Sequence, residues 1–270
     1  MFVLSGTTPP KSAGEFAQRL QQGLQQFLSW GPKSRVTATG NAPAFSRVAI
    51  DLSGSTIPLE RPACLPNTKG RKVGTLTIDS LSITARPIHC GGSRASVEFQ
   101  GQQISGELRN IGHGLSAFLP DEAEGRIGAE MDVNDIVNLA ANMLQPLLAK
   151  HDTTCRDWAL QFTKTGPRSL QMRATVTATK KLLVFSRTEP FELTGRMDVD
   201  DELNATFADL QIRGTGMIGE LAAQKIQPKL NDFNGYVVPL SALPVRGLKF
   251  RDVAADVARN RLALSGSFAI

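Results

Sequence analysis

The sequence predicts an α+β fold in which a strongly curved antiparallel sheet wraps around a long amphipathic helix. Three observations predict it. Apolar residues recur at helical spacing in three separate segments, runs of two-residue alternation lie between them, and turn clusters separate these runs. Strands grouped between isolated helices indicate antiparallel sheet rather than alternating βαβ units. We expect one domain over residues 1–270, with two pseudo-repeated halves, about 1–150 and 151–270, as an open alternative.

The first predicted helix begins after Ser12, which fits a capping box together with Glu15. Glutamine residues fill most of one side, so the segment is amphipathic, and Gly31-Pro32 ends it after about 17 residues. Its apolar stripe is formed by Phe16, Leu20, Leu24 and Phe27.

Strand periodicity follows over much of residues 35–110 and returns at 170–179, 182–186, 191–199 and 204–212. Helices are predicted at 132–150 and 217–230, the latter with Ile218, Leu221 and Ile226 on its apolar face. The two helices contain similar five-residue sequences, Leu144-Gln-Pro-Leu-Leu148 and Ile226-Gln-Pro-Lys-Leu230, and this similarity favours a duplicated unit. Three final strands are predicted at 236–240, 248–257 and 261–268.

Composition excludes several classes of protein. With 41% apolar and 20% charged residues and a net charge of +5, the chain is not disordered. Only three cysteines occur, so a disulfide scaffold is excluded, although Cys64 and Cys90 are either a disulfide pair or two unlinked thiols. Residues 1–8 do not form a signal peptide, so the chain is either cytoplasmic or begins after a removed leader.

Catalytic and nucleic-acid motifs receive little support. Gly214-Thr-Gly216-Met-Ile-Gly219 matches a dinucleotide fingerprint, but the chain after it lacks the strands and helices of that fold, so a tight strand-to-helix turn is preferred. Aromatic residues make up 6% of the chain, which is too few for stacking platforms on nucleic acid. No cofactor or metal is expected, and the protein is predicted not to be an enzyme. A hydrolase that uses His113 or His151 is the last-ranked alternative.

The final hundred residues resemble the bacterial TULIP-like (tubular lipid-binding) family. The resemblance rests on Met172-Arg-Ala-Thr-Val, Phe191-Glu-Leu-Thr-Gly-Arg-Met-Asp-Val-Asp and the closing Leu262-Ala-Leu-Ser-Gly266, together with the leucine-spaced helix between them. It implies a long helix wrapped by a curved sheet, an elongated apolar cavity for phospholipid or a related lipid, and a location in the cell envelope or periplasm.

The sequence therefore predicts non-enzymatic binding or transfer of a phospholipid-like ligand, driven by burial of acyl chains. Arg71 and Lys72 are candidates for contact with a headgroup phosphate, and peripheral contact with an anionic membrane surface is compatible with the basic charge. The alternative is an envelope scaffold with a packed core and no ligand. The expected lipid-lining residues are Phe16, Leu20, Leu24, Phe27, Ile218, Leu221 and Ile226.

Overall fold

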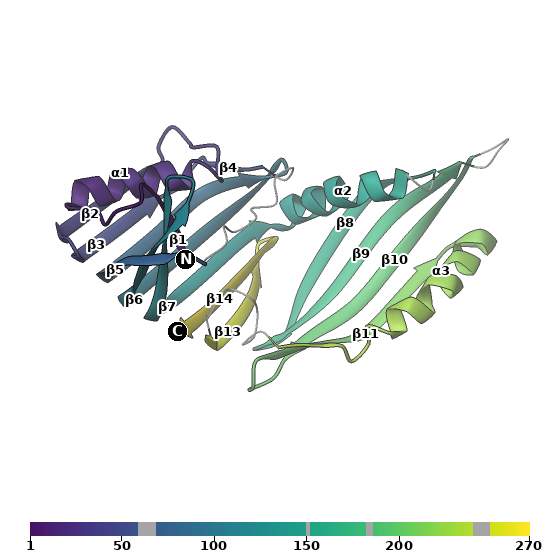
Figure 1. Ribbon diagram of the computed structural model, residues 1–270. Coiled ribbons are helices and arrows are strands. Elements are labelled where there is room, and N and C mark those ends of the chain that lie inside the picture. The colour runs from purple at the N-terminus through teal and green to yellow at the C-terminus, as the bar shows by residue number, and fades with distance from the viewer. Residues whose placement is uncertain (59–68, 150–151, 182–185, 240–248) are drawn as a thin grey trace. The chain divides into compact units, whose positions relative to one another are not determined.

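The protein is mostly β-structure and divides into two compact units. The computed structural model describes residues 1–58, 69–149, 152–181, 186–239 and 249–270, and most of these residues lie in strands, with three helices among them. The first unit comprises Met1–Glu130, Ala242–Asp252 and Ser265–Ile270, and the second comprises Met131–Ser241 and Val253–Leu264 (Figure 1). The division therefore lies at residue 130 rather than near 150, and the C-terminal segment contributes to both units.

The first unit is built on a mixed nine-stranded sheet whose main order is β13-β14-β7-β6-β5-β3-β2. Its strands β5 and β6 have 20 residues each, far longer than an ordinary strand. Its elements are β1 (Phe2–Ser5), α1 (Ala13–Leu24), β2 (Arg35–Asn41), β3 (Ala44–Asp51), β4 (Thr56–Ile57), β5 (Arg71–Cys90), β6 (Ser93–Gly112) and β7 (Leu115–Asp132). The strands β13 (Lys249–Ala258) and β14 (Arg261–Ala269) complete this sheet and are shared with the second unit.

The prediction of one antiparallel sheet is wrong. β3 and β4 both pair with β5 in parallel, so the first sheet is mixed rather than antiparallel, and a second sheet lies in the second unit. The reason is that alternation along a strand shows which side chains share a face, but it does not show which strand is the neighbour or in which direction it runs.

The prediction of a long central helix is also wrong. α1 has only 12 residues and ends at Leu24, after which the backbone N–H groups of Phe27 and Leu28 both bond to the Leu24 carbonyl in a tight final turn. Its beginning agrees with the sequence, because the Ser12 hydroxyl accepts the Glu15 N–H at 3.2 Å.

A filled core lies between α1 and the first sheet. The Phe16 ring stacks on Phe45 with 4.4 Å between centroids, and both side chains are at most 1% exposed. Phe118 and Leu108 are likewise completely buried. This unit therefore buries its apolar face in the ordinary way, by packing side chain against side chain.

The second unit is an antiparallel five-stranded sheet in the order β12-β11-β10-β9-β8, with two helices. Helices 132–150 and 217–230 of the sequence analysis are confirmed within a residue or two. Predicted strand 182–186 lies outside the described residues except for Ser186, as does Leu240 of strand 236–240. The elements are α2 (Val133–Ala149), β8 (Thr153–Gly166), β9 (Ser169–Lys181), β10 (Ser186–Val199), β11 (Asn204–Gly214), α3 (Gly216–Asn231) and β12 (Val237–Pro239).

The repeated Gln-Pro pair of the two helices has a shared structural role. Gln145 of α2 accepts the backbone N–H of Cys155 in β8 at 3.1 Å. Gln227 of α3 accepts the backbone N–H of Ile212 in β11 at 2.9 Å and donates to the Leu210 carbonyl at 2.9 Å. A glutamine amide thus joins each helix to a strand of the sheet: α2 to the edge strand β8, and α3 to β11.

Candidate functional site

The long strands of the second sheet place their apolar residues on one face, which we call the inner face. Side chains alternate between the two faces of a strand, and the register aligns this alternation across neighbours. One row crosses four strands: Leu193 lies opposite both Ala174 and Ile212, and Ala174 lies opposite Leu160. The inner face comprises Cys155, Trp158, Leu160, Phe162, Leu170, Met172, Ala174, Val176, Ala178, Phe191, Leu193, Met197, Val199, Ala205, Phe207, Leu210 and Ile212.

The opposite face of the same sheet is polar. Arg173 and Glu192 pair across β9 and β10, with 3.0 Å from Nε to Oε2. Thr179 and Thr188 are joined by a hydroxyl hydrogen bond of 2.9 Å. Water can solvate these groups, so only the inner face requires an apolar cover.

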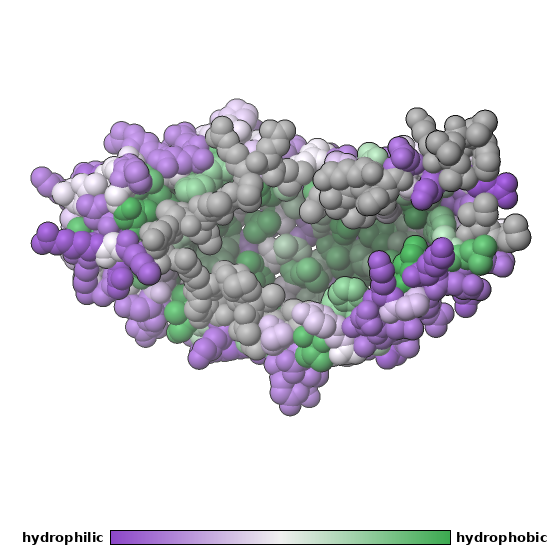
Figure 2. All heavy atoms as spheres, turned by 45° about the vertical axis from the view of Figure 1, so that its right-hand side comes forward, coloured by the Kyte–Doolittle hydropathy of each residue, from purple (hydrophilic) through white to green (hydrophobic). Residues whose placement is uncertain are grey.

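The inner face is only partly covered. Trp158, Phe162, Met172 and Phe191 are half-buried, whereas the corresponding large side chains of the first unit are sealed from water. Within the described residues α2 packs mainly along β8, and α3 packs mainly along β11 and β10. In the right-hand half of Figure 2, apolar residues line a hollow over this part of the chain.

Two polar groups of the inner face have properties that suit an apolar surface. Burial raises the pKa of the Cys155 thiol, so this group stays neutral and acts as a small apolar side chain. The indole Nε1 of Trp158 is buried and has no hydrogen-bond partner in the described part of the chain. An unpartnered buried donor of this kind is uncommon in a folded protein, and it marks the surroundings of Trp158 as apolar.

Charged residues occur on the inner face only toward the ends of the strands. At one end, Lys180 of β9 lies directly opposite Arg187 of β10, and Glu189 follows two residues later on the same face. At the other end, Lys164 of β8 lies opposite Leu170 and forms an ion pair of 3.0 Å with Asp256. Between these ends the face is apolar over the length of β9 from Leu170 to Ala178.

The residues predicted to line a cavity from the first helix lie in the packed core of the first unit or at its margin. Phe16 and Leu20 are 1% exposed, and Leu24 packs against the same cluster. Phe27 is half-buried beyond the end of α1. These side chains therefore do not line an open face.

The third helix uses a different side from the one predicted. Leu221 and Ile226 are 53% and 40% exposed, and the side chain of Ile218 lies outside the described residues. α3 instead buries Gly219 and Ala223, which lie one turn apart. Gln227 lies one further turn along the same side of the helix. Small residues allow closer approach to β11 than the larger apolar ones, and the amide of Gln227 fixes the contact.

The predicted headgroup residues belong to the first unit. Arg71 and Lys72 lie at the start of β5 and are exposed. The Lys72 ammonium is 2.9 Å from Glu107, whose carboxylate also accepts hydrogen bonds from Arg109. These two neighbours lower the pKa of Glu107. Arg71 and Lys72 therefore belong to the first unit, and the charge of Lys72 is engaged there by Glu107.

The glycine-rich motif makes a turn at which there is no place for a nucleotide. A Cβ atom on Gly214 would lie 2.2 Å from the Gly219 carbonyl oxygen, so strand and helix meet at backbone distance. The Glu189 carboxylate lies at the start of α3, 3.1 Å from an ideal Cβ on Gly216, where a phosphate would otherwise bind. β12 then returns antiparallel to β11, which excludes a parallel dinucleotide fold.

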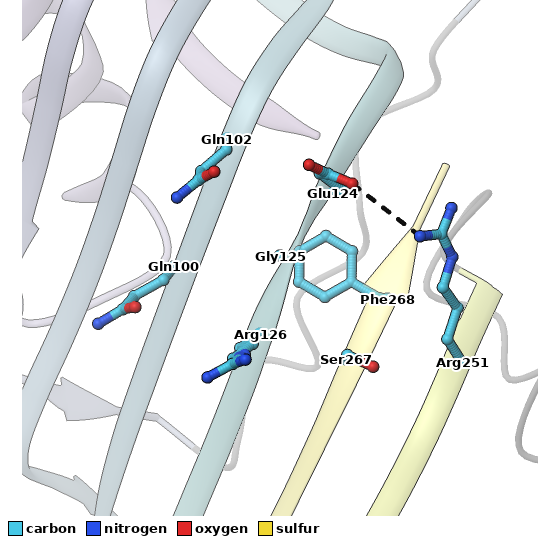
Figure 3. A pocket seen from close by; sticks show the side chains of 8 residues that line it. All are labelled: Gln100, Gln102, Glu124, Gly125, Arg126, Arg251, Ser267 and Phe268. Carbon is cyan, nitrogen blue, oxygen red and sulfur yellow. Dashed lines mark ion pairs between the residues drawn. The ribbon is translucent and has the colours of Figure 1, made fainter.

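A separate pocket of about 400 Å³ lies on the first unit. Figure 3 shows the Phe268 ring against Gly125, with Gln100 and Gln102 on the neighbouring strand and the ion pair of Glu124 with Arg251 at 3.9 Å. Its lining is mostly polar and charged, and Phe268 is its one large apolar side chain. In the described ranges no group of three His, Cys, Asp or Glu side chains could hold a metal ion, and no helix is long and apolar enough to cross a membrane.

The comparisons with known proteins add no relative. No protein family model, no curated protein and no solved structure matches the chain. The inner face is therefore the feature of the molecule that bears on its function.

Proposed function

We propose that the second unit binds the acyl chains of a lipid on the inner face of its sheet. The observation that carries this proposal is a continuous apolar surface over four strands whose large side chains stay half-buried. Partly exposed contiguous apolar surface is uncommon in a protein without a ligand or partner and marks a binding surface. Binding is non-covalent, and no chemical step is involved.

The shape and chemistry of the face suit a chain of methylene groups. The apolar part of β9 from Leu170 to Ala178 extends for about 26 Å at ~3.3 Å per residue. Within this floor the strand backbones pair with one another, so an acyl chain would meet side chains and not unpaired N–H or C=O groups. Each buried methylene contributes about 0.8 kcal/mol, so a single chain supplies enough free energy for stable binding.

The first unit supports a different role. Its apolar face is sealed by α1, and its largest core side chains are almost completely buried. A filled interior favours a structural function, so the scaffold hypothesis of the sequence analysis applies best to this part of the chain. We assign lipid binding to the second unit only.

Two neighbouring substitutions test the proposal. Val176→Asp places a carboxylate on the inner face, and Thr177→Asp places the same group on the outer face one residue later. Trp30→Phe leaves Trp158 as the single tryptophan, so quenching of its fluorescence by a diacylglycerol with brominated chains reports binding directly beside Val176.

We expect saturable quenching in the Trp30→Phe protein, strong loss of it in Val176→Asp, and little change in Thr177→Asp. Circular dichroism and thermal unfolding confirm that the two variants remain folded. Absence of quenching in the Trp30→Phe protein, together with no lipid in an organic extract of the purified chain, would exclude the proposal.

A further inference from the structure

One end of the inner face carries a pair of opposing positive charges. Lys180 and Arg187 face each other across β9 and β10, in the same alternation as Val176 and Phe191, and both side chains are exposed. Like charges directly opposite each other on adjacent strands destabilise a sheet. Such a pair at the margin of an apolar surface is therefore a feature that an anion would stabilise.

The neighbouring carboxylate neutralises only part of this charge. Glu189 lies on the same face, with 3.6 Å between its Oε1 and the Nε of Arg187, and it also lies at the start of α3. Lys180 has no ion-pair partner among the described residues. The three side chains together leave a surplus of one positive charge on this end of the inner face.

We propose that Lys180 and Arg187 bind the phosphate of a phospholipid headgroup, with the acyl chains running along the inner face toward Leu170. This inference rests on the proposed function of the second unit. A guanidinium presents two parallel donors to phosphate oxygens, and an ammonium adds a point charge beside it. One phosphodiester carries a single negative charge, which matches the surplus.

The opposite end of the face determines the direction of the ligand. Lys164 is the cation at that end, and Asp256 already neutralises it at 3.0 Å. A phosphate there would have to displace a carboxylate, whereas at Lys180 it meets an unpaired ammonium. The headgroup is therefore assigned to the end formed by the start of β8, the end of β9 and the start of β10.

The fluorescence of Trp158 can report the direction in which the lipid lies on the inner face. The register places it beside Val176, four residues from Lys180, or about 13 Å along the strand. Leu170 lies about 20 Å away on the other side. With the headgroup at Lys180, bromine in the half of the chain nearest the glycerol quenches Trp158 more strongly than bromine at the methyl end.

The experiment compares two lipids with identical brominated chains, phosphatidylglycerol and diacylglycerol, both delivered from cyclodextrin to the Trp30→Phe protein. The test variant combines Lys180→Gln with Arg187→Gln. The matched control combines Arg173→Gln with Arg213→Gln, which removes the same formal charge from the outer face. We expect the test variant to lose about tenfold or more in affinity for phosphatidylglycerol, with unchanged affinity for diacylglycerol.

The outcomes separate this inference from the proposed function. Unchanged affinity of the test variant for phosphatidylglycerol, equal loss in the control, equal loss for diacylglycerol, or stronger quenching from the methyl end would each overturn the headgroup assignment while lipid binding stands. Inorganic phosphate that binds as tightly as the phospholipid would overturn assignment to a lipid. Failure of both lipids to quench Trp158 in the protein with its native Lys180 and Arg187 would remove the proposed function itself.

Discussion

The ring of Phe16 in α1 stacks on the ring of Phe45 in β3, with 4.4 Å between their centroids. Both rings are almost completely buried, so the contact has no room for a ligand. We predict that Phe16→Ala lowers the free energy of unfolding by about 3–5 kcal/mol, because it removes buried apolar area and leaves a cavity. Urea denaturation monitored by circular dichroism measures the change.

Phe27→Ala is the matched control for this prediction. Phe27 shares the sequence stripe of Phe16 but lies half-buried beyond the end of α1, so its loss costs roughly 1 kcal/mol. Quenching of Trp158 by brominated lipid should be unchanged in both variants under native conditions. A large loss of lipid affinity in folded Phe16→Ala would show that the first unit contributes to the binding site.

The amide of Gln227 joins α3 to β11, and its removal should loosen this helix. Gln227→Leu leaves the Ile212 N–H without its acceptor, which costs about 1–3 kcal/mol. It also removes one of the two donors to the Leu210 carbonyl, the other being the Asn234 amide at 3.4 Å. Gln224→Leu changes an exposed residue of the same helix and should have little effect. Hydrogen exchange at Ile212 provides the local readout, and equal exchange in the two variants would contradict the role assigned to Gln227.

The ion-pair network of Glu107 predicts a pH dependence of stability. Lys72 and Arg109 lower the folded-state pKa of this carboxyl below its ordinary value of 4.5. Its contribution is therefore fully present above the unfolded-state pKa and is lost as the pH falls through the folded-state pKa. Glu107→Gln should lower the urea midpoint at pH 7 and have a smaller effect near pH 3. If the difference in urea midpoint between the native protein and Glu107→Gln were larger at pH 3 than at pH 7, the stabilising role assigned to the Glu107 carboxylate would be contradicted.

Cys155 provides a chemical probe of the inner face. Burial raises its pKa, so its thiolate fraction at pH 8.5 is smaller than that of an ordinary thiol, and alkylation should be slow and accelerate as the pH rises further. We expect bound lipid to slow this alkylation again, because Cys155 lies on the floor that the lipid would cover. Mass spectrometry of peptides measures the rate at Cys155, and unchanged labelling in lipid would count against binding on this face.

Much of the local structure could be predicted from the sequence. The Ser12 cap and the two later helices follow from side-chain spacing, since a helix repeats every 3.6 residues whatever it packs against. The alternation around Val176 and Leu193 also identified strands whose residues share a face. These features depend on residues close together in the sequence, so they can be predicted from a single sequence.

The site itself could not be found in this way. Periodicity identifies an apolar face, but it does not show whether a helix seals that face, as α1 does over Phe45, or leaves it half-covered, as at Phe191. Likewise, Lys180 and Arg187 meet only through the pairing of β9 with β10. The parallel pairing of β3 with β5 depends on long-range topology, and no local pattern encodes it.

The glutamines of α2 and α3 have one more consequence. Long strands that end a sheet offer rows of unpaired backbone groups to any extended peptide, and such rows are the usual starting point for domain exchange and fibril growth. At Cys155 and Ile212 these groups are already occupied by side-chain amides. A foreign strand that paired with β8 at Cys155, or with β11 beyond its short pairing with β12, would first have to break a bond that holds a helix in place. The two amides that position the helices therefore also oppose the addition of such a strand.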